Sequence, residues 1–333
     1  MGKKAVALVL AVVGLALLFA CSKSEQEQPE NFVLSGREMP RLVALIPESP
    51  QGEIYGIGYG YFSDQLKADA GQYRFQYQIE RFDGAQELAS LIETAQCDYL
   101  YVHSTYDPAL AAALNARQEQ GVKIILFGDA LDDFKPDYHI YIDYAGMGRQ
   151  AAQYINQYFA ERLESSGTLA VAMLGQAQNE EQTAYFNALE TALASEFELL
   201  FIQEEDVGAQ TAQVLEQMDL SDAARLCCGV ALDAPSANAF MQSVLQYNKT
   251  LALQVELIGF TGVQDDEINR IAYSPIDLFT CDMSPSLMIT AAKYCAQCVS
   301  GEKTQEMPLQ ATLIDKFNVE SYKLSDEYLI RLQ

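Results

Sequence analysis

The cysteines are the residues whose spacing comes closest to a redox or metal-binding motif. Cys295 and Cys298 form a Cys-x-x-Cys pair, the spacing of thiol redox sites and of half a zinc site. The pair falls late in a predicted helix, whereas a redox pair needs a helix N-terminus to lower its thiol pKa. A zinc site is disfavoured because the chain has two histidines and no second such pair.

The remaining cysteines fit a packed interior better than a site. Cys227 and Cys228 lie in an apolar, strand-like run, where neighbouring side chains point to opposite faces. For all six cysteines after Cys21 we expect structural thiols, with one disulfide as the alternative. These residues are Cys97, Cys227, Cys228, Cys281, Cys295 and Cys298.

The sequence approaches two enzyme motifs and matches neither. Gly56, Gly58 and Gly60 follow the first predicted strand, but their Gly-x-Gly-x-Gly spacing differs from a dinucleotide-binding loop, and we expect them to serve close helix packing. A Gly-x-Ser-x-Gly elbow is absent, and His103 and His139 show no Ser/Asp partnership. We therefore predict no enzyme activity, no cofactor and no metal.

The amino terminus has the pattern of an export signal. Lys3 and Lys4 precede sixteen apolar residues, Ala5 to Ala20, and Cys21 follows. This run is short for a membrane span, which needs about 20 residues. Residues 18–21 (LFAC) resemble the bacterial lipobox, which implies cleavage before Cys21 and lipidation of its side chain; the alternative is an uncleaved anchor. Both predict an extracytoplasmic protein held at a bacterial membrane.

The charge of the chain excludes one class of partner. The formal net charge is −25, from 21 basic and 46 acidic residues in a chain of 333. Such a surface repels phosphate backbones and anionic lipid, so nucleic acid is a poor partner and the N-terminal lipid is the expected membrane contact. The 19 tyrosines supply side chains that both stack on a ligand and hydrogen-bond to it.

Strand-like and helix-like segments alternate through the rest of the chain, which predicts parallel sheets with helical crossovers. The polar alternation of 73–80 favours an edge strand, and the apolar run at 123–128 a buried one. Strands are predicted at 41–46, 73–80, 99–102, 123–128, 139–142, 169–174, 198–203, 227–232, 255–260 and 278–281, with a last one within 309–324. Helices are predicted at 54–70, 84–95, 107–119, 145–164, 178–195, 208–218, 234–247, 264–271 and 284–299.

Several strings, in order, resemble the type I periplasmic-binding-protein family, which includes ribose- and galactose-type sugar-binding proteins and LacI-type effector domains. These strings are GVKIILFGDA (121–130), YIDYAGMGRQAAQYI (141–155), LIGFTG (257–262), the segment 274–302 and QATLIDKFNV (310–319). The resemblance covers about 40–324. It implies an α/β fold of two doubly wound parallel-sheet lobes joined by a multi-strand hinge, with a ligand cleft at the carboxyl ends of the strands.

The expected organisation combines the amino-terminal pattern, the polar composition of 22–39 and this resemblance. Residues 1–21 are the signal peptide and 22–39 a flexible tether. Residues 40–143 with 283–308 form the N-terminal lobe, and 144–282 with 309–333 the C-terminal lobe. For Asp143 and Asp233 a helix N-cap role is the alternative to ligand contact. By position, the candidate ligand-binding residues are Ser49, Glu53, Tyr55, His103, Ser104, Thr105, Asp129, Asp143, Gln182, Asp233, Thr261 and Asp282.

The resemblance implies a lipid-anchored solute-binding protein that closes on a small polar ligand and passes it to an ABC permease. Three usual sugar clamps are missing, because Gln182 replaces Arg, Leu232 replaces the first Asn of Asn-Asp, and Thr261 replaces the Asp of Phe-Asp-Gly. The ligand therefore stays open among sugars, polyols and nucleosides. The alternative function is a sensor that presents its closed form to a membrane receptor or kinase.

Overall fold

A computed structural model provides the coordinates of the protein. It describes residues 39–48, 53–103, 110–177, 180–203, 206–232, 234–251, 256–259, 268, 271–273, 277–282, 286–302 and 305–325. The predicted signal peptide, Cys21 and nearly all of the tether lie outside these residues. Within the described part of the chain, no helix combines the length and the apolar character needed to cross a membrane.

The first six-stranded sheet is entirely parallel, in the order β11-β5-β4-β3-β1-β2. The interior strands β1, β3 and β4 are buried on both faces, as expected for a sheet covered on both sides. The polar strand at the edge is β2, as predicted, and the interior apolar strand is β4. The strands are β1 (Arg41–Pro47), β2 (Gln76–Phe82), β3 (Tyr99–His103), β4 (Lys123–Phe127), β5 (Tyr138–Ile142) and β11 (Glu306–Leu309).

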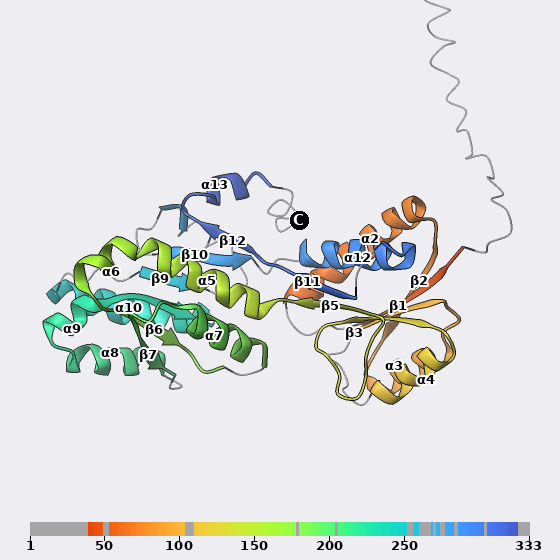
Figure 1. Ribbon diagram of the computed structural model, residues 1–333, viewed down its shortest axis with the longest axis horizontal. Coiled ribbons are helices and arrows are strands. Elements are labelled where there is room, and N and C mark those ends of the chain that lie inside the picture. The colour runs from red at the N-terminus through yellow and green to blue at the C-terminus, as the bar shows by residue number, and fades with distance from the viewer. Residues whose placement is uncertain are drawn as a thin grey trace, which may run out of the picture. The chain divides into compact units, whose positions relative to one another are not determined.

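Two pairs of helices cover the first sheet (Figure 1). On one face α2 (Glu53–Tyr73) packs against α12 (Ser286–Ser300), and on the other α3 (Ala85–Thr94) lies beside α4 (Ala111–Glu119). Alternate residues of β1 enter the two cores: Leu42 and Ala44 face α2, whereas Val43 and Leu45 face α3.

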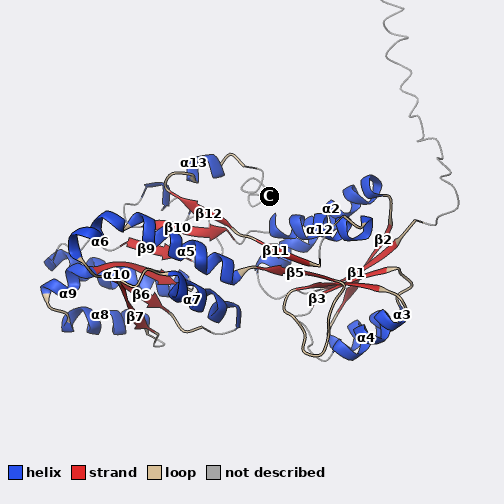
Figure 2. Ribbon diagram, viewed as in Figure 1, coloured by secondary structure: helices blue, strands red, loops and turns tan. Residues whose placement is uncertain are grey.

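The second sheet repeats this order as β12-β10-β9-β8-β6-β7. Helices α5 and α7 pack together on one face, and α8 and α10 on the other (Figure 2). The strands are β6 (Leu169–Leu174), β7 (Phe197–Ile202), β8 (Leu226–Ala231), β9 (Glu256–Gly259), β10 (Asp277–Asp282) and β12 (Thr312–Asp315). The helices are α5 (Tyr144–Tyr158), α6 (Ala160–Ser166), α7 (Glu180–Ala192), α8 (Val207–Gln217), α9 (Leu220–Arg225), α10 (Ala234–Leu251) and α13 (Val319–Tyr322).

The predicted fold class is confirmed, with local corrections. The strand β11 was not predicted. The last strand, β12, runs antiparallel to β10, so the second sheet is not wholly parallel. The predicted helix 145–164 is interrupted at Phe159, which separates α5 from α6. The short helices α9 and α13 were also missed.

The cysteines take the structural role that was predicted. Cys97, Cys227, Cys228, Cys295 and Cys298 are free thiols, and the last four are buried. Burial is the main cause that raises the pKa of Cys295 well above its usual value, and this keeps the thiol protonated and unreactive. The side chain of Cys281 lies outside the described residues.

The glycines of the rejected dinucleotide motif lie within α2, whereas that motif needs them at the strand-to-helix turn. The expected close packing fails at Gly60, since a Cβ atom built there meets nothing within 4 Å.

Candidate ligand-binding site

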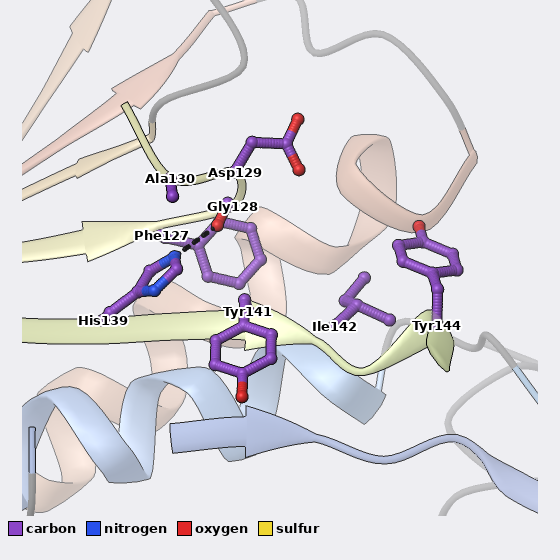
Figure 3. A pocket seen from close by; sticks show the side chains of 8 residues that line it. All are labelled: Phe127, Gly128, Asp129, Ala130, His139, Tyr141, Ile142 and Tyr144. Carbon is purple, nitrogen blue, oxygen red and sulfur yellow. Dashed lines mark hydrogen bonds between the residues drawn. The ribbon is translucent and has the colours of Figure 1, made fainter. Parts of the chain in front are cut away.

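A pocket lies at the carboxyl ends of β4 and β5, the edge of the sheet where α/β proteins bind ligands. It has a volume of about 120 Å³. Its walls combine one carboxylate, one imidazole and three aromatic rings with small residues (Figure 3). The lining residues are Phe127, Gly128, Asp129, Ala130, His139, Tyr141, Ile142 and Tyr144.

The turn after β4 forms one wall of the pocket. Gly128 has a φ of 99°, a left-handed conformation that favours glycine, and this reverses the chain directly after Phe127. The Gly128 N–H donates to the carbonyl of Ile140 at 2.9 Å, and its own carbonyl lies 2.7 Å from His139 Nε2. The turn is therefore fixed to β5 through both of its backbone polar groups.

Asp129 presents its carboxylate from this turn (Figure 3). Partial burial raises its pKa, the Glu180 carboxylate adds to that rise, and His139 opposes it. Asp129 nevertheless stays exposed, so its carboxylate is accessible to a hydrogen-bond donor of a ligand. Asp129 is therefore suited to accept hydrogen bonds from hydroxyl or amino groups of a ligand.

Asp143 joins β5 to α5 and is the N-cap of that helix. Its Oδ1 accepts a hydrogen bond from the Gly146 N–H at 2.7 Å, and its Oδ2 lies 3.5 Å from Arg149 Nη2. The N-cap alternative is thus confirmed. This cap fixes the first turn of α5, which carries Tyr144 into the pocket wall. Ligand contact by Asp143 itself stays a prediction.

His103 lies in the interior of the first sheet. Its side chain is fully buried, its Nδ1 lies 2.5 Å from the Tyr59 hydroxyl, and its ring packs on Phe127 with centroids 4.8 Å apart. Burial lowers the pKa of His103 to about 3, so the ring is neutral at ordinary pH. The geometry gives His103 a structural role, and its contact with a ligand stays a prediction.

The other predicted site residues are only partly described. Glu53 and Tyr55 lie in the first turn of α2, and Asp282 is the last residue of β10, but their side chains are outside the described residues. Gln182 lies half-buried on α7. Five residues lie outside the described part of the chain: Ser49, Ser104, Thr105, Asp233 and Thr261.

Sequence reasoning missed four important pocket residues: Gly128, His139, Tyr141 and Tyr144. A signal for the tyrosines was present, because both stand next to the end of a predicted strand. Tyr141 and Tyr144 line the same pocket as Asp129 because Phe127 pairs with Ile140. The sequence does not show this pairing. No group of three His, Cys, Asp or Glu side chains that could hold a metal ion occurs among the described residues.

Comparison with known proteins rests on structure alone. No protein-family model matches the chain, and no curated protein matches it in sequence. The two sheets, each with its first strand second from one edge and with three chain passages between them, define a type I periplasmic-binding-protein fold.

Solved structures that share this fold include sugar-binding components of ABC transporters. A periplasmic ribose ABC transporter protein from Conexibacter woesei matches with a TM-score of 0.64 at 16% identity, over 88% of this chain and 97% of that one. A sugar-binding protein from Bacillus halodurans matches with a TM-score of 0.60 at 14% identity, over 85% and 99%. A solute-binding protein from Actinobacillus succinogenes with bound D-allose has a TM-score of 0.56 at 16% identity, over 85% and 100%.

Proposed function

We propose that the protein is a lipid-anchored solute-binding protein that captures a small, hydroxyl-rich ligand by hinge closure and delivers it to an ABC importer. The observation that carries this proposal is the pocket at the carboxyl ends of β4 and β5, whose lining includes Asp129 and three aromatic side chains. The structural neighbours include proteins that bind ribose-type sugars and D-allose, which supports the same ligand class here.

The pocket offers two kinds of contact to such a ligand. The rings of Tyr141 and Tyr144 give flat apolar surfaces with a polar hydroxyl at the rim, which suits the alternating C–H and O–H groups of a sugar or polyol. Asp129 accepts hydrogen bonds and repels anions. A phosphorylated or carboxylate ligand is therefore disfavoured, and a neutral or cationic one is favoured.

The ligand class extends beyond common pentoses and hexoses. The Arg, Asn and Asp clamps of the family are replaced by Gln182, Leu232 and Thr261, so the usual charged hydrogen bonds are not all available. Glycerol and D-arabinose are bound in other proteins of this fold, from Mycobacterium smegmatis and Burkholderia graminis. Polyols and nucleosides therefore belong in any ligand screen.

The complete proposed site extends beyond the pocket. Further residues are proposed to join Asp129 when the lobes close on the ligand, namely Ser49, Glu53, Tyr55, His103, Ser104, Thr105, Asp143, Gln182, Asp233, Thr261 and Asp282.

The lipid anchor is proposed at the amino terminus, where residues 1–21 are the signal peptide and Cys21 the lipidation site. Labelled palmitate should enter the wild-type protein and not Cys21→Ser when both are expressed in a bacterial host; equal labelling would contradict lipidation at Cys21.

Thermal unfolding of the detergent-solubilised protein against D-ribose, D-galactose, D-allose, glycerol and adenosine tests the ligand class. Ligand at about 100 times its dissociation constant should stabilise the protein by about 2.7 kcal/mol. Asp129→Ala should remove most of this stabilisation, while Asp132→Ala, an exposed aspartate in the same loop, should keep it. A shift that Asp129→Ala leaves intact would place binding elsewhere, and no shift with any of the five compounds would contradict the proposed ligand class.

A sensor role is the second candidate function, because one structural neighbour is the XylFII–LytSN complex, in which a protein of this fold is bound to a second protein. Genes next to the coding gene distinguish the two functions. Permease and ATPase genes would support import, and a kinase gene without them would support sensing.

A further inference from the structure

The His139 ring connects three separate parts of the first sheet. It stands on β5, its Nε2 lies 2.7 Å from the Gly128 carbonyl oxygen, and its Nδ1 lies 3.1 Å from Glu306 Oε2 on the edge strand β11 (Figure 3 draws the first contact). The imidazole is mostly buried, with 12% of its side chain exposed, whereas Glu306 is 59% exposed. One side chain thus joins the pocket turn, the hinge-proximal strand β5 and β11.

Both partners of the ring are acceptors. A carbonyl oxygen cannot donate a hydrogen bond, and an ionised carboxylate cannot either. The two contacts therefore exist together only if both ring nitrogens carry hydrogen, or if a proton on Glu306 is donated to Nδ1. In either case the His139–Glu306 pair holds one proton, and its loss to solvent leaves the Nδ1 lone pair facing a carboxylate.

Charged and polar groups lie around the ring. Glu306 faces the ring from β11, and Asp129 interacts with it from the turn after β4. Tyr141, two residues along β5, packs its ring on the imidazole with centroids 4.9 Å apart. One carboxylate thus contacts the imidazole directly and a second acts on it through space, and histidine is the side chain whose charge ordinarily changes between pH 5 and 8.

We infer that the His139–Glu306 pair is a proton-dependent clamp that holds β11 to β5 beside the Gly128–Asp129 turn, and that this attachment supports the turn during ligand binding. The inference rests on the proposed function, since the turn carries the carboxylate assigned to the ligand. With its proton the ring donates to both the Gly128 carbonyl and Glu306. Without it Nε2–H still donates to the Gly128 carbonyl, and only the Glu306 contact on β11 becomes repulsive. Only two residues separate β11 from β12, so the clamp acts beside a chain passage between the two sheets. His139 is thus a positioning residue.

Glu306→Gln is the decisive variant. The amide of glutamine can donate to a neutral Nδ1 and, after rotation, can accept from a protonated one. Both ring contacts then persist with or without the extra proton. The exposed position of residue 306 makes this substitution compatible with folding. The variant should therefore abolish the pH dependence of the clamp without removing the clamp.

The first readout requires no ligand. Imidazole and backbone NMR signals are followed from pH 5 to pH 9 in wild type and Glu306→Gln. We expect the wild-type amide signals of β11 to shift as His139 loses its proton, and those of Glu306→Gln to shift much less. The only other histidine, His103, is buried and neutral and serves as an internal control. Signals of β11 that ignore His139 titration in the wild type, or titrate equally in both proteins, would overturn the inference.

The second readout is the affinity for D-ribose, D-galactose and D-allose, measured by calorimetry at pH 5.5 and pH 8.5. Wild-type affinity for a bound sugar should fall about tenfold at the higher pH, the change expected for loss of one charge-assisted hydrogen bond. Glu306→Gln should change less than about twofold, which follows from its retained hydrogen bonds. Equal pH dependence in both proteins would contradict the clamp. If none of these sugars binds at either pH, the sugar form of the proposed function fails, and the NMR titration still decides the clamp.

Discussion

The two six-stranded sheets share one strand order but fill their interiors differently. Beneath α2 the first sheet packs large aromatic side chains, with Phe62 and Tyr101 at 4.7 Å between ring centroids, around the buried imidazole of His103. The second sheet packs small residues at its centre. Gly229 of β8 lies against the Phe240 ring, and Gly148 of α5 lies against the backbone of α7.

This difference shows that one topology tolerates two ways of packing. Aromatic packing leaves room for a polar group, which must then be hydrogen-bonded, as His103 is to Tyr59. Packing by close backbone approach leaves no such room, because every added atom meets a neighbour. We therefore expect the first sheet to be sensitive to protonation and the second to added volume.

The largest expected effect is at Gly148 in the second half. A Cβ atom there lies 2.2 Å from the Tyr185 carbonyl oxygen and 3.1 Å from the Leu189 nitrogen, both backbone atoms of α7. Gly148→Ala must separate two helices and should cost about 4 kcal/mol of unfolding free energy. Urea denaturation measures this loss.

The matched control for that substitution lies in the first half. Gly60 is also inside a helix, and a Cβ there meets nothing within 4 Å. Gly60→Ala should stabilise the protein by up to about 1 kcal/mol through helix propensity. If both substitutions destabilise equally, the proposed difference between the two sheets is wrong.

The second prediction concerns acid and His103. Its folded-state pKa of about 3 lies below the value of 6.5 for an exposed histidine, so between these values the unfolded chain binds a proton that the native chain does not. The contribution is full above pH 6.5 and is lost as the pH falls toward 3. From pH 7 to pH 4 it should amount to on the order of 3 kcal/mol.

His103→Gln isolates this contribution, because glutamine does not titrate and still offers Tyr59 a hydrogen-bond partner. Its unfolding free energy should fall less steeply with acid than that of the wild type. Parallel pH profiles for the two proteins would show that His103 is solvated in the native state.

The third prediction tests close packing within the second sheet. A Cβ on Gly229 lies 2.6 Å from Phe240 Cε1 and 2.9 Å from Leu174 Cδ1. These are side-chain atoms that can shift, so Gly229→Ala should cost about 2 kcal/mol, less than Gly148→Ala. Adding Phe240→Leu should recover part of this loss if the ring is the obstacle. Strictly additive losses in chemical denaturation would exclude that explanation.

The smallest expected effect is at Asp137, which precedes β5 in the first sheet. Burial acts to raise the pKa of Asp137, but hydrogen bonds from Lys123, Gln118 and the Ile124 amide outweigh it, and the net pKa is lowered. Its stabilisation is present above the unfolded-state pKa and is lost as the pH falls through the folded-state value. Asp137→Asn should cost about 1 kcal/mol at pH 7, because the Lys123 partner is largely exposed.

Equilibrium urea denaturation of both proteins at pH 7 and pH 3 measures this difference in unfolding free energy. The difference between Asp137→Asn and wild type should shrink at the lower pH. A difference that is the same at both pH values would mean that the carboxylate charge contributes nothing.

The sequence predicted those parts of the fold that local patterning determines. The β6 strand coincides with its predicted range, and the edge position of β2 followed from its polar alternation. The four-residue strand β11 has too few residues for a periodic signal. The antiparallel direction of β12 depends on a two-residue link and on pairing with β10, which are tertiary features.

The site was predicted to a smaller extent for a similar reason. Asp129 and Asp143 stand directly after strands, where the fold places its ligand groups, and both positions follow from chain order. The roles of His139 and Tyr141 depend on β5 pairing with β4 on one side and β11 on the other. Those pairings join residues far apart in sequence, so composition and spacing do not reveal them.

The late position of β11 in the chain has a consequence for biosynthesis. His139 on β5 and Glu306 on β11 are 167 residues apart, so the first sheet stays incomplete until nearly the whole chain has been made. At 5–20 residues per second, β5 has an unpaired edge for roughly 10–30 s after its own synthesis. An open strand edge is a site of unwanted pairing between chains. The nascent protein must therefore be kept from pairing with other chains during that interval. A shorter segment between β5 and β11 would reduce the time for which the β5 edge is unpaired.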